Sequence, residues 1–497
     1  MKLKVKIISL DTGGKSICVI NIKDAMEFGV HPLDKIVLRK GGRRTTVTVD
    51  VSKDFVEPGS IVVYNDVRDS MKLKTRDIVH AEARKPLVSK HYIRRKTDGA
   101  ELNYNELLEI VSDVVARNLN DLELASFITA LHVRGLTLNE SFNMSRAMIK
   151  TGKKLKFSGK VVDKHSIGGV PGDKTSMLVV PIITAAGLTM PKTSSRSITS
   201  PAGTADRMEV LAPVELDTNE IKRVVKKTGG CLVWGGAVDM APADDLFIRI
   251  EHSLGLDPLL LPSVMSKKAS VGCKYLVIDI PTGNGSKIDS KESAERLASE
   301  FIELGKKMNI KVDCAVTRGD QPVGYAIGPA LEAREALQNL TGKTRSDVFD
   351  KATSIAGILF GMVGKGNKKL AEEMIKSGKA EAKMREIIGA QGGNPRIKID
   401  DIAIGDFEFH VRSRHSGLID GINNRAIVDI CRSAGTPNDK GAGVLLGKKT
   451  GEVVKKGDII FTIYAEKSAK LRSAIKTAKS YDVYSMLSKN RMLMEKI

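Results

Sequence analysis

Short runs of alternating or continuous apolar residues dominate the first 84 positions of the chain. The runs KLKVKII, SICVINI, KIVLRK, RTTVTVDV and SIVVYNDV are separated by Gly, Asp and Pro, which is the pattern of short β-strands. They predict a β-rich N-terminal module over residues 1–84. Within it, Gly14-Lys15-Ser16 matches the end of a P-loop, but the glycine required five positions before the Gly-Lys pair is replaced by Ser9. We therefore interpret this segment as a hairpin turn.

The period of the apolar positions then changes from two to about three and a half. From Leu107 to Val115 they recur at the spacing of one helix face, and the segments Leu122–Leu131 and Glu140–Lys150 repeat this pattern. The change predicts a helical domain over residues 85–160, to which further helices return from later in the chain.

Strand and helix patterns alternate over residues 161–390. The strand runs are GKVVDKHS, LTMPKTSS, CLVWGG, KYLVIDI and IKVDCAV; the helix patterns are Thr175–Ala186, Pro213–Lys227, Lys291–Lys307, Ala330–Leu340 and Arg345–Phe360. This order predicts a central α/β domain with a mixed sheet in which parallel pairing is favoured. The apolar run Met177–Met190 contains Pro181 and is too short for a membrane span, so we expect a buried helix.

The Gly-rich segment GAQGGNP at 389–395 ends this domain. Short strands divided by glycines follow, as in GVLLGKKTGEVVKKGDIIFTIYAE, and predict a hammerhead-like α/β domain over residues 391–497. The fold class is therefore a multidomain α+β and α/β protein: a β-rich module, a helical domain, a central α/β domain and a C-terminal hammerhead-like domain.

The amino-acid composition indicates the cellular compartment of the protein more clearly than its function. Hydrophobic residues make up 42% of the chain, charged residues 28% and aromatic residues 4%, and the net charge is +20. The basic excess attracts anions and leaves open an RNA-binding protein, although aromatic stacking platforms are scarce. The cysteines are scattered and odd in number, which favours free thiols over disulfides or zinc. The N-terminus lacks a signal-peptide pattern, so we expect a cytoplasmic protein.

The segment KHSIGGVPGDKTS, residues 164–176, is the first that could carry chemistry. It links a strand to a helix, so its backbone N–H groups and the helix N-terminus could approach an anion. Lys164 would add a full charge, and Ser166 and Ser176 neutral donors. The alternative is an ordinary Gly-rich turn with a Ser or Thr helix cap.

Three further segments carry polar side chains in loops. TSSRSITSPAGTADR, residues 193–207, places six hydroxyl residues around Arg196 ahead of Pro201, which could hold a second anion or a sugar or form a solvated loop. Asp257 precedes Pro258 in a predicted turn, where a helix cap is the alternative. The segment IPTGNGSK follows a strand, and its Lys287 could hold a phosphate or be a surface lysine.

Together these segments resemble the thymidine phosphorylase family of nucleoside phosphorylases. The likeness covers about residues 88–497 and includes KHSIGGVPGDKTS, SSRSITSPAGTADRME, MAPADDLFIRIEH, TRGDQPVGYAIGPALEA, GAQGGNPR and NDKGAGVLLGKKTGEVVKKGD. The extra N-terminal module, the loop SRSITSPAG and the pair Asp257-Pro258 are similar to the archaeal branch of this family that acts on nucleoside 5′-monophosphates.

The resemblance implies roles for individual residues. It implies a proton donor at Asp257. It implies inorganic phosphate binding by Lys164, Ser166, Ser176, Ser194 and Thr204. It implies AMP binding by Gly169, Ser195, Arg196, Ser197, Ile198, Thr199, Ser200, Thr204, Ser263 and Lys287. Arg249 and Lys267 match residues that touch the base in the pyrimidine enzymes.

The implied reaction is phosphorolysis: AMP and phosphate give adenine and ribose 1,5-bisphosphate, with CMP and UMP as further substrates. Inorganic phosphate is then a co-substrate, and no cofactor, metal, nucleic acid or membrane is implied. A homodimer or larger homo-oligomer is expected. The nearest alternative is a pyrimidine nucleoside (thymidine) phosphorylase. A phosphoribosyltransferase would need an acidic magnesium motif, which does not occur near the phosphate loop.

Overall fold

The structure is a computed structural model that describes residues 1–83, 87–197, 200–238, 240–343 and 345–487. The chain divides into two compact units, one formed by Met1–Gly135 with Arg249–Leu256 and the other by Leu136–Ile248 with Asp257–Ile497. In these described ranges, every helix is too short or too polar to cross a membrane.

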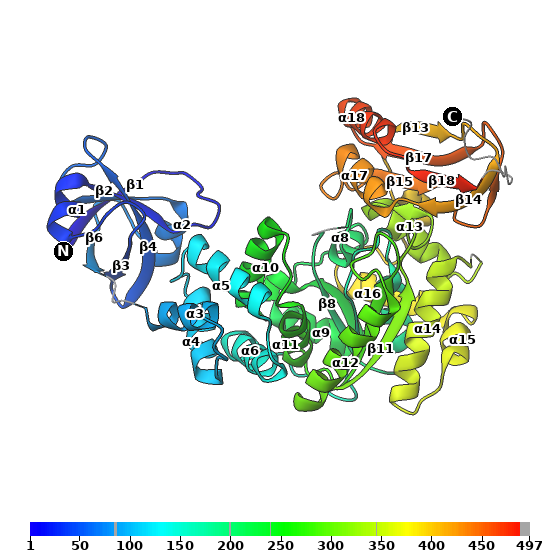
Figure 1. Ribbon diagram of the computed structural model, residues 1–497, viewed down its shortest axis with the longest axis horizontal. Helices are drawn as coiled ribbons and strands as arrows, with labels where there is room; N and C mark the ends of the chain where they lie inside the picture. Colours follow the sequence, from blue (N-terminus) through cyan, green and yellow to red (C-terminus); the bar gives the residue numbers. More distant parts are fainter. Residues whose placement is uncertain (84–86, 198–199, 239, 344, 488–497) are drawn as a thin grey trace, which may run out of the picture. The chain divides into compact units, whose positions relative to one another are not determined.

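The first unit begins with a closed β-barrel, drawn in blue in Figure 1. Its strand order is β1-β5-β2-β4-β3-β6, in which β1 lies parallel to β5 and β2 parallel to β4. The strands are β1 (Lys2–Ile7), β2 (Ile17–Asn21), β3 (Lys35–Lys40), β4 (Arg43–Ser52), β5 (Ser60–Val63) and β6 (Ile78–Ala83). Alternate side chains such as Leu3 and Val5 fill the core, and α1 (Ile22–Phe28) and α2 (Asn65–Met71) add Ala25, Val67 and Met71 to it.

Two features of the barrel differ from the sequence-based expectation. The strand β6 and both short helices were not predicted. The turn at Gly13 and Gly14 is not a hairpin, because β1 and β2, which flank it, are not neighbours in the barrel. Both glycines have positive φ, a conformation that a tight turn requires and that glycine adopts without strain.

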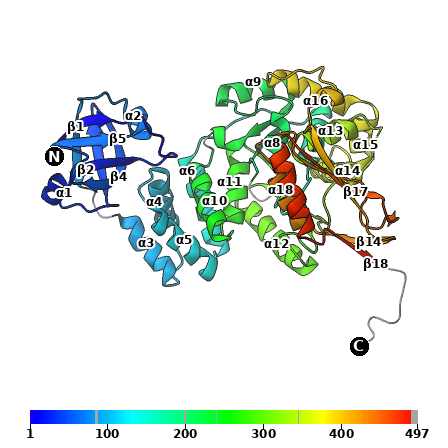
Figure 2. The ribbon, with the colours of Figure 1, turned by 90° about the horizontal axis from the view of Figure 1, so that it is seen from above.

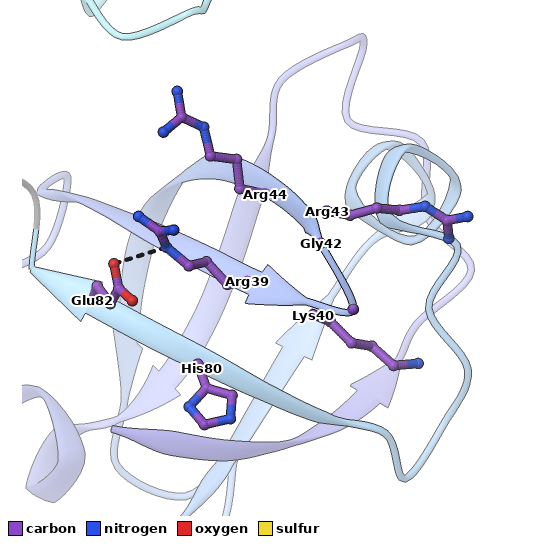
Figure 3. Close-up of a pocket in the computed structure, with 8 residues that line it drawn as sticks. Arg39, Lys40, Gly42, Arg43, Arg44, His80 and Glu82 are labelled. Atoms are coloured by element: carbon purple, nitrogen blue, oxygen red, sulfur yellow. Dashed lines mark hydrogen bonds and ion pairs between the residues drawn. The ribbon is translucent and has the colours of Figure 1, made fainter.

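A basic pocket of about 310 Å³ lies at the turn between β3 and β4. It is lined by Arg39, Lys40, Arg43, Arg44 and His80 together with Gly41, Gly42 and Glu82. Figure 3 shows the long basic side chains fanning out in different directions, with Arg39 turned to Glu82. Such an arrangement spreads positive charge over a surface and does not focus it on one small anion.

The helices α3 (Val88–Thr97), α4 (Tyr104–Val115) and α5 (Asp121–Arg134) complete the first unit with the end of α10 (Pro242–Leu254). Capping boxes start α4 at Asn103 and α5 at Asn120. The next helix, α6 (Leu138–Thr151), belongs to the second unit and packs against α11 (Leu260–Ser270). The helices predicted between residues 85 and 160 are therefore shared between the two units.

Parallel strands form the centre of the second unit. The order β11-β10-β7 continues to β8-β9 through an isolated bridge between Val161 and Thr189. The strands are β7 (Val162–Ser166), β8 (Met190–Ser194), β9 (Gly230–Trp234), β10 (Tyr275–Thr282) and β11 (Lys311–Arg318). The strands β11, β10 and β7 pair in parallel, as do β8 and β9, so the carboxyl ends of these strands lie along one edge.

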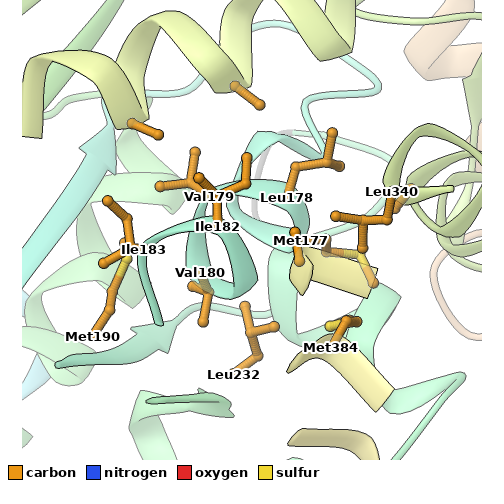
Figure 4. Packing of buried hydrophobic residues seen from close by; sticks show 14 of the residues in the cluster. Met177, Leu178, Val179, Val180, Ile182, Ile183, Met190, Leu232, Leu340 and Met384 are labelled. Carbon is orange, nitrogen blue, oxygen red and sulfur yellow. The ribbon is translucent and has the colours of Figure 1, made fainter. Parts of the chain in front are cut away.

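Helices cover the sheet and build the largest core. The helix α7 (Thr175–Ala185) is buried over almost its whole length, and its apolar side chains pack against Met190, Leu232, Leu340 and Met384 (Figure 4). It ends earlier than the apolar run suggested, because Gly187 turns the chain with positive φ and Met190 begins β8. The second unit also contains α8 (Thr204–Glu209), α9 (Thr218–Thr228), η1 (Gly235–Val238) and α12 (Lys291–Lys307). Figure 2 shows a further group lying together: α13 (Pro329–Leu340), α14 (Asp347–Met362), α15 (Lys368–Lys376) and α16 (Lys379–Ala390).

Antiparallel sheets form the C-terminal part of this unit. One has the order β12-β15-β17-β13 and the other β16-β14-β18, with α17 (Asn424–Ala434) and α18 (Ser468–Lys479) beside them and η2 (Ile399–Asp401) before them. The strands are β12 (Ala326–Ile327), β13 (Phe407–Arg412), β14 (Gly417–Ile422), β15 (Gly443–Leu446), β16 (Val453–Val454), β17 (Ile459–Ala465) and β18 (Tyr484–Leu487). The strand β12 comes from the segment between β11 and α13, so the C-terminal sheet also uses residues from before position 391.

Candidate active site

The candidate residues lie where parallel strands end. Lys164 and Ser166 are in β7, Ser194 is the last residue of β8, and Lys287 is in the loop after β10. Because β10 pairs with β7 and β7 is bridged to β8, the three loops that follow these strands start at neighbouring positions on one edge of the sheet. Such an edge is where open α/β sheets place their ligands.

The loop after β7 is held tightly to its surroundings. The Ile167 amide donates to the Asp279 carbonyl of β10 at 3.0 Å. The buried ammonium of Lys174 donates to the carbonyls of Val323 and Ala326 and to Glu335 Oε2, at 2.9, 3.0 and 2.6 Å. Lys174 therefore holds the loop in place, and its ammonium charge is paired with the carboxylate of Glu335.

Lys164 is the second buried lysine of this loop, and it lies near the carboxylates of Asp173 and Asp279. Its side chain is buried, and burial lowers the pKa of Lys164, while the carboxylates of Asp173 and Asp279 partly offset that effect. Burial alone would raise the pKa of Asp173, but the ammonium groups of Lys351 and Lys164 hold it well below its usual range. The loop therefore contains ionised groups that are fixed in place before any ligand arrives.

Ser166 and Ser176 flank this loop. The Ser166 hydroxyl accepts a bond from the Gly168 amide at 3.4 Å, and Ser176 lies in the first turn of α7. The N-terminus of a helix carries partial positive charge and unpaired N–H groups. Lys164, Ser166 and Ser176 thus belong to one strand–loop–helix unit.

The loop after β8 uses its arginine differently from the simplest sequence interpretation. The Arg196 guanidinium donates to Glu209 at 2.6 and 2.8 Å and to Glu215 at 2.7 Å, and it lies 5.0 Å from the centre of the Trp234 ring. The hydrogen bonds that Arg196 donates to Glu209 raise the pKa of Arg196 further above its already high value. Because carboxylates neutralise this guanidinium, the backbone of the loop is the better candidate to face a ligand.

Asp206 shapes that backbone. Its carboxylate accepts bonds from the amides of Ser197 and Gly203 at 2.6 and 2.8 Å. Gly203 has no room for a side chain, since a Cβ there would lie 2.5 Å from the Ser195 carbonyl. The hydroxyl of Ser200 donates to the Ala202 carbonyl at 2.8 Å. The predicted ligands Ile198 and Thr199 lie outside the described residues.

Arg207 joins the loops that follow β7 and β8. Its guanidinium donates to the Asp173 carbonyl and to the Ala202 carbonyl, both at 2.7 Å, and its Nε lies 2.5 Å from Glu332. Thr204, at the start of α8, accepts a longer bond from the same guanidinium at 3.5 Å. The hydroxyl of Ser194 donates to the Val233 carbonyl at 3.2 Å.

Gly169, Asp257 and Lys287 converge although they are far apart in the sequence. Lys287 Nζ lies 2.8 Å from Asp257 Oδ2. A Cβ on Gly169 would lie 2.8 Å from the Lys287 backbone nitrogen, and Gly169 has φ of +92°, so a glycine is needed there. Ser263 lies in the first turn of α11, six residues after Asp257, with its amide bonded to the Leu259 carbonyl.

The two residues that match base contacts in the pyrimidine enzymes, Arg249 and Lys267, form ion pairs with other side chains. Arg249 belongs to the first unit, where its guanidinium donates to Asp121 at 2.8 Å, and Lys267 donates to Asp244 at 2.6 Å. Sequence reasoning also missed Lys351 of α14, which contacts Asp173 and Asp279. Its only signal in the sequence was a lysine near the start of a helix whose later positions are mostly apolar.

Comparison with known proteins identifies the class to which these features belong. Residues 90–152 match the helical bundle domain and residues 158–381 the a/b domain of the glycosyl transferase family, and residues 418–485 match the pyrimidine nucleoside phosphorylase C-terminal domain. The structure is similar to anthranilate phosphoribosyltransferase from Thermus thermophilus, with a TM-score of 0.52 and 18% identity, over 60% of this chain and 99% of that one. This last likeness concerns the fold alone. The protein is thus a glycosyl transferase with a phosphorylase-type C-terminal domain.

Similarity over the whole length narrows the class. The chain is 43% identical to the AMP phosphorylase of Thermofilum pendens over 100% of this chain and 98% of the relative. It is 48% identical to the AMP phosphorylase of Pyrococcus horikoshii and 47% identical to that of Thermococcus kodakarensis, over 96% of each chain. The chain belongs to the AMP phosphorylase family.

Proposed function

We propose that this protein cleaves the glycosidic bond of AMP with inorganic phosphate and releases adenine and ribose 1,5-bisphosphate. The observation that carries the proposal is the meeting of Gly169, Lys287 and Asp257 beside the strand–loop–helix unit of Lys164. A basic group for a 5′-phosphate and a carboxyl group for a leaving base stand together there. The names of the full-length relatives support the same reaction.

Two anion sites are needed for this reaction. Lys164, Ser166 and Ser176 would hold the attacking phosphate, with Ser194 and Thr204 from the neighbouring loop. Lys287 and the backbone of residues 195–200 would hold the 5′-phosphate and ribose, with Gly169, Thr204 and Ser263 nearby. The chemistry explains the division: positive charge develops on the ribose ring as the bond breaks, and a phosphate dianion fixed below the ring stabilises it and then bonds to C1′.

Asp257 is our candidate for the acid that protonates the leaving base. The carboxyl group must be protonated for this step, and its proton passes to the base as the bonding electrons leave C1′. His165 is less suited, because burial and the ammonium groups of Lys268 and Lys192 hold the pKa of His165 well below its usual range. A neutral imidazole carries no extra proton to give.

We extend the proposal in three respects. CMP and UMP are further substrates, since we assign the loop after β8 to the phosphate and sugar and not to the base. No cofactor takes part, and phosphate is the co-substrate. The protein works as a homodimer or larger assembly. It works in a reducing compartment such as the cytoplasm, because the five cysteines, all within the described ranges, are unpaired and mostly buried.

A substrate panel tests the proposal. The purified chain is given phosphate with AMP, CMP, UMP, adenosine or thymidine, and the sugar product is identified by mass. We expect AMP to be cleaved with the highest kcat/KM and ribose 1,5-bisphosphate to form. Faster cleavage of thymidine or uridine than of every monophosphate would identify a pyrimidine nucleoside phosphorylase instead. Salt-dependent RNA binding without phosphorolysis would support a binding protein.

A further inference from the structure

Lys287 and Asp257 form an ion pair in the absence of ligand. Lys287 Nζ lies 2.8 Å from Asp257 Oδ2, and the side chains are 36% and 44% exposed. Within the described ranges, each is the other's only ion-pair partner. The pair joins two segments that the chain separates widely, the turn between α10 and α11 and the loop between β10 and α12.

The backbone fixes the base of Lys287 but leaves its tip able to move. Gly169 of the phosphate loop packs against the Lys287 backbone nitrogen and Cγ. The hydroxyl of Ser286 donates to the Gly283 carbonyl at 2.7 Å and closes the turn before Lys287. No comparable bond holds the ammonium group apart from that to Asp257, as far as the described residues extend, and water reaches both partners.

The pair places an ammonium group beside the carboxyl group that we propose as the acid. A neighbouring ammonium favours a carboxylate, whereas a neighbouring anion favours the protonated carboxyl group. Because exposed ion pairs are weak, a phosphate group can replace the carboxylate as the partner of the lysine. A 5′-phosphate carries nearly two negative charges at neutral pH and several acceptor oxygens, so it competes well for one ammonium group.

We propose that Lys287 couples recognition of the 5′-phosphate to protonation of Asp257, and this inference rests on the proposed function. Without a 5′-phosphate, Lys287 stays paired with Asp257. When a nucleotide binds, its phosphate draws Lys287 away and places negative charge nearby, and Asp257 takes up a proton from solvent. That proton then passes to the leaving base while phosphate bonds to C1′, and the carboxylate is ready for the next cycle.

The coupling makes a specific statement about selectivity. A lysine that only binds the 5′-phosphate would discriminate against nucleosides through KM. A lysine that also restrains the acid lowers kcat for nucleosides as well, because adenosine leaves the ion pair intact. Removing the lysine should therefore weaken AMP binding and at the same time release the acid for adenosine.

The test compares wild type with Lys287→Gln, using AMP and adenosine, and measures kcat, KM and their pH dependence. For Lys287→Gln we expect KM for AMP to rise about tenfold or more, since a charge-assisted bond is lost. We expect kcat for adenosine to rise by up to about fivefold, the limit set by the strength of an exposed pair, with the alkaline limb of its pH profile moved to higher pH. Lys287→Arg keeps a positive charge beside Asp257, so the alkaline limb for adenosine should stay at lower pH than in Lys287→Gln.

Lys291→Gln is the matched control, because Lys291 lies four residues further on and, among the residues that the structure describes, its ion pair is an exposed one with Glu295 at 3.6 Å. It should behave as wild type. Equal losses of kcat with both substrates in Lys287→Gln, without a shift of the pH profile, would overturn the coupling and leave Lys287 as a binding residue. Wild type that fails to cleave AMP at all would instead contradict the proposed function, so the two failures are distinguishable.

Discussion

Replacing Lys351 by Met removes a buried charge that holds the phosphate loop to the sheet. Lys351 Nζ lies 3.3 Å from Asp173 Oδ2 in the loop and 2.9 Å from Asp279 Oδ2 in β10, and its side chain is 9% exposed. Burial alone would lower the pKa of Lys351, but the two carboxylates raise it above its ordinary value. The ammonium is therefore charged, and Met has a similar length without the charge.

The cost follows from the two carboxylates left behind. Breaking a buried ion pair by removing one partner costs about 3–5 kcal/mol. A cooperative unit of about 350 residues has an unfolding entropy of about 0.7 kcal/mol/K, so we expect Tm to fall by about 4–7 °C. Asp173 would also turn to Lys164, its other close cation, and neutralise part of the charge that we propose for phosphate binding. We therefore expect KM for phosphate to rise about tenfold, the loss of about 1.4 kcal/mol, and KM for AMP to change less than about twofold.

Thermal unfolding and steady-state kinetics with phosphate and AMP varied separately check both effects. The matched control is Lys376→Met, because Lys376 makes an exposed pair with Glu372 at 3.0 Å that contributes at most about 1 kcal/mol. If Lys351→Met unfolds within about 1 °C of this control and keeps its KM for phosphate, the buried bridge between α14 and the loop has no energetic role. A fall in Tm with equal rises of both KM values would leave a structural role only.

Three further changes test other parts of the site. Asp257→Asn should lower kcat by about 10²–10⁴ with little change in KM for AMP, and steady-state turnover close to wild type would eliminate Asp257 as the acid. Gly169→Ala should raise Kd for AMP several-fold, because its Cβ would push the Lys287 backbone; titration calorimetry with AMP measures this directly. Arg196 lowers the pKa of Glu209 from 4.5 to about 2, so the bond stabilises the fold above pH 4.5 and is lost as pH falls through about 2. The difference in unfolding free energy between wild type and Glu209→Gln should then shrink across that range.

Local patterns were enough for much of the fold. The helix predicted over Lys291–Lys307 has the same bounds in the structure, because its apolar face is regular and Ser290 caps it by accepting a bond from the Ser293 amide. The strands of the barrel and of the central sheet also appear where short apolar runs lie between turn residues. Such elements depend on neighbours within a few positions, which the sequence displays directly.

Long-range pairing escaped prediction for a physical reason. The strand β12 consists of Ala326–Ile327 and exists only because it pairs with β15, more than a hundred residues later. The first part of the helix α10 belongs to the second unit and its end belongs to the first unit. This division depends on tertiary contacts, which the helix's own sequence pattern does not display. The helices α15 and α16 were not predicted, although the sequence before the Gly-rich segment carries their amphipathic pattern.

The site shows the same division between local and distant information. Gly-rich loops after strands mark the phosphate loop and the loop of Lys287 in the sequence. The partners that orient them do not appear there: Arg207 reaches back to Asp173 over 34 positions, and Lys351 reaches it over 178. The resemblance implies that Arg196 binds AMP, and nothing in the sequence indicated that Glu209 and Glu215, at no regular spacing, would neutralise its guanidinium.

The contrast between the two proposed anion sites explains why only one of them can respond to the substrate. Lys164 is buried among fixed charges, so moving it would expose unpaired groups at a cost of several kcal/mol, and it suits a phosphate that is always required. Lys287 is partly exposed, and exchanging its carboxylate partner for a phosphate costs at most about 1 kcal/mol. A group that responds to a 5′-phosphate must be able to change its partner, and this requires a weak, solvent-exposed ion pair. Lys287 makes such a pair with Asp257. The buried lysines of the phosphate loop do not.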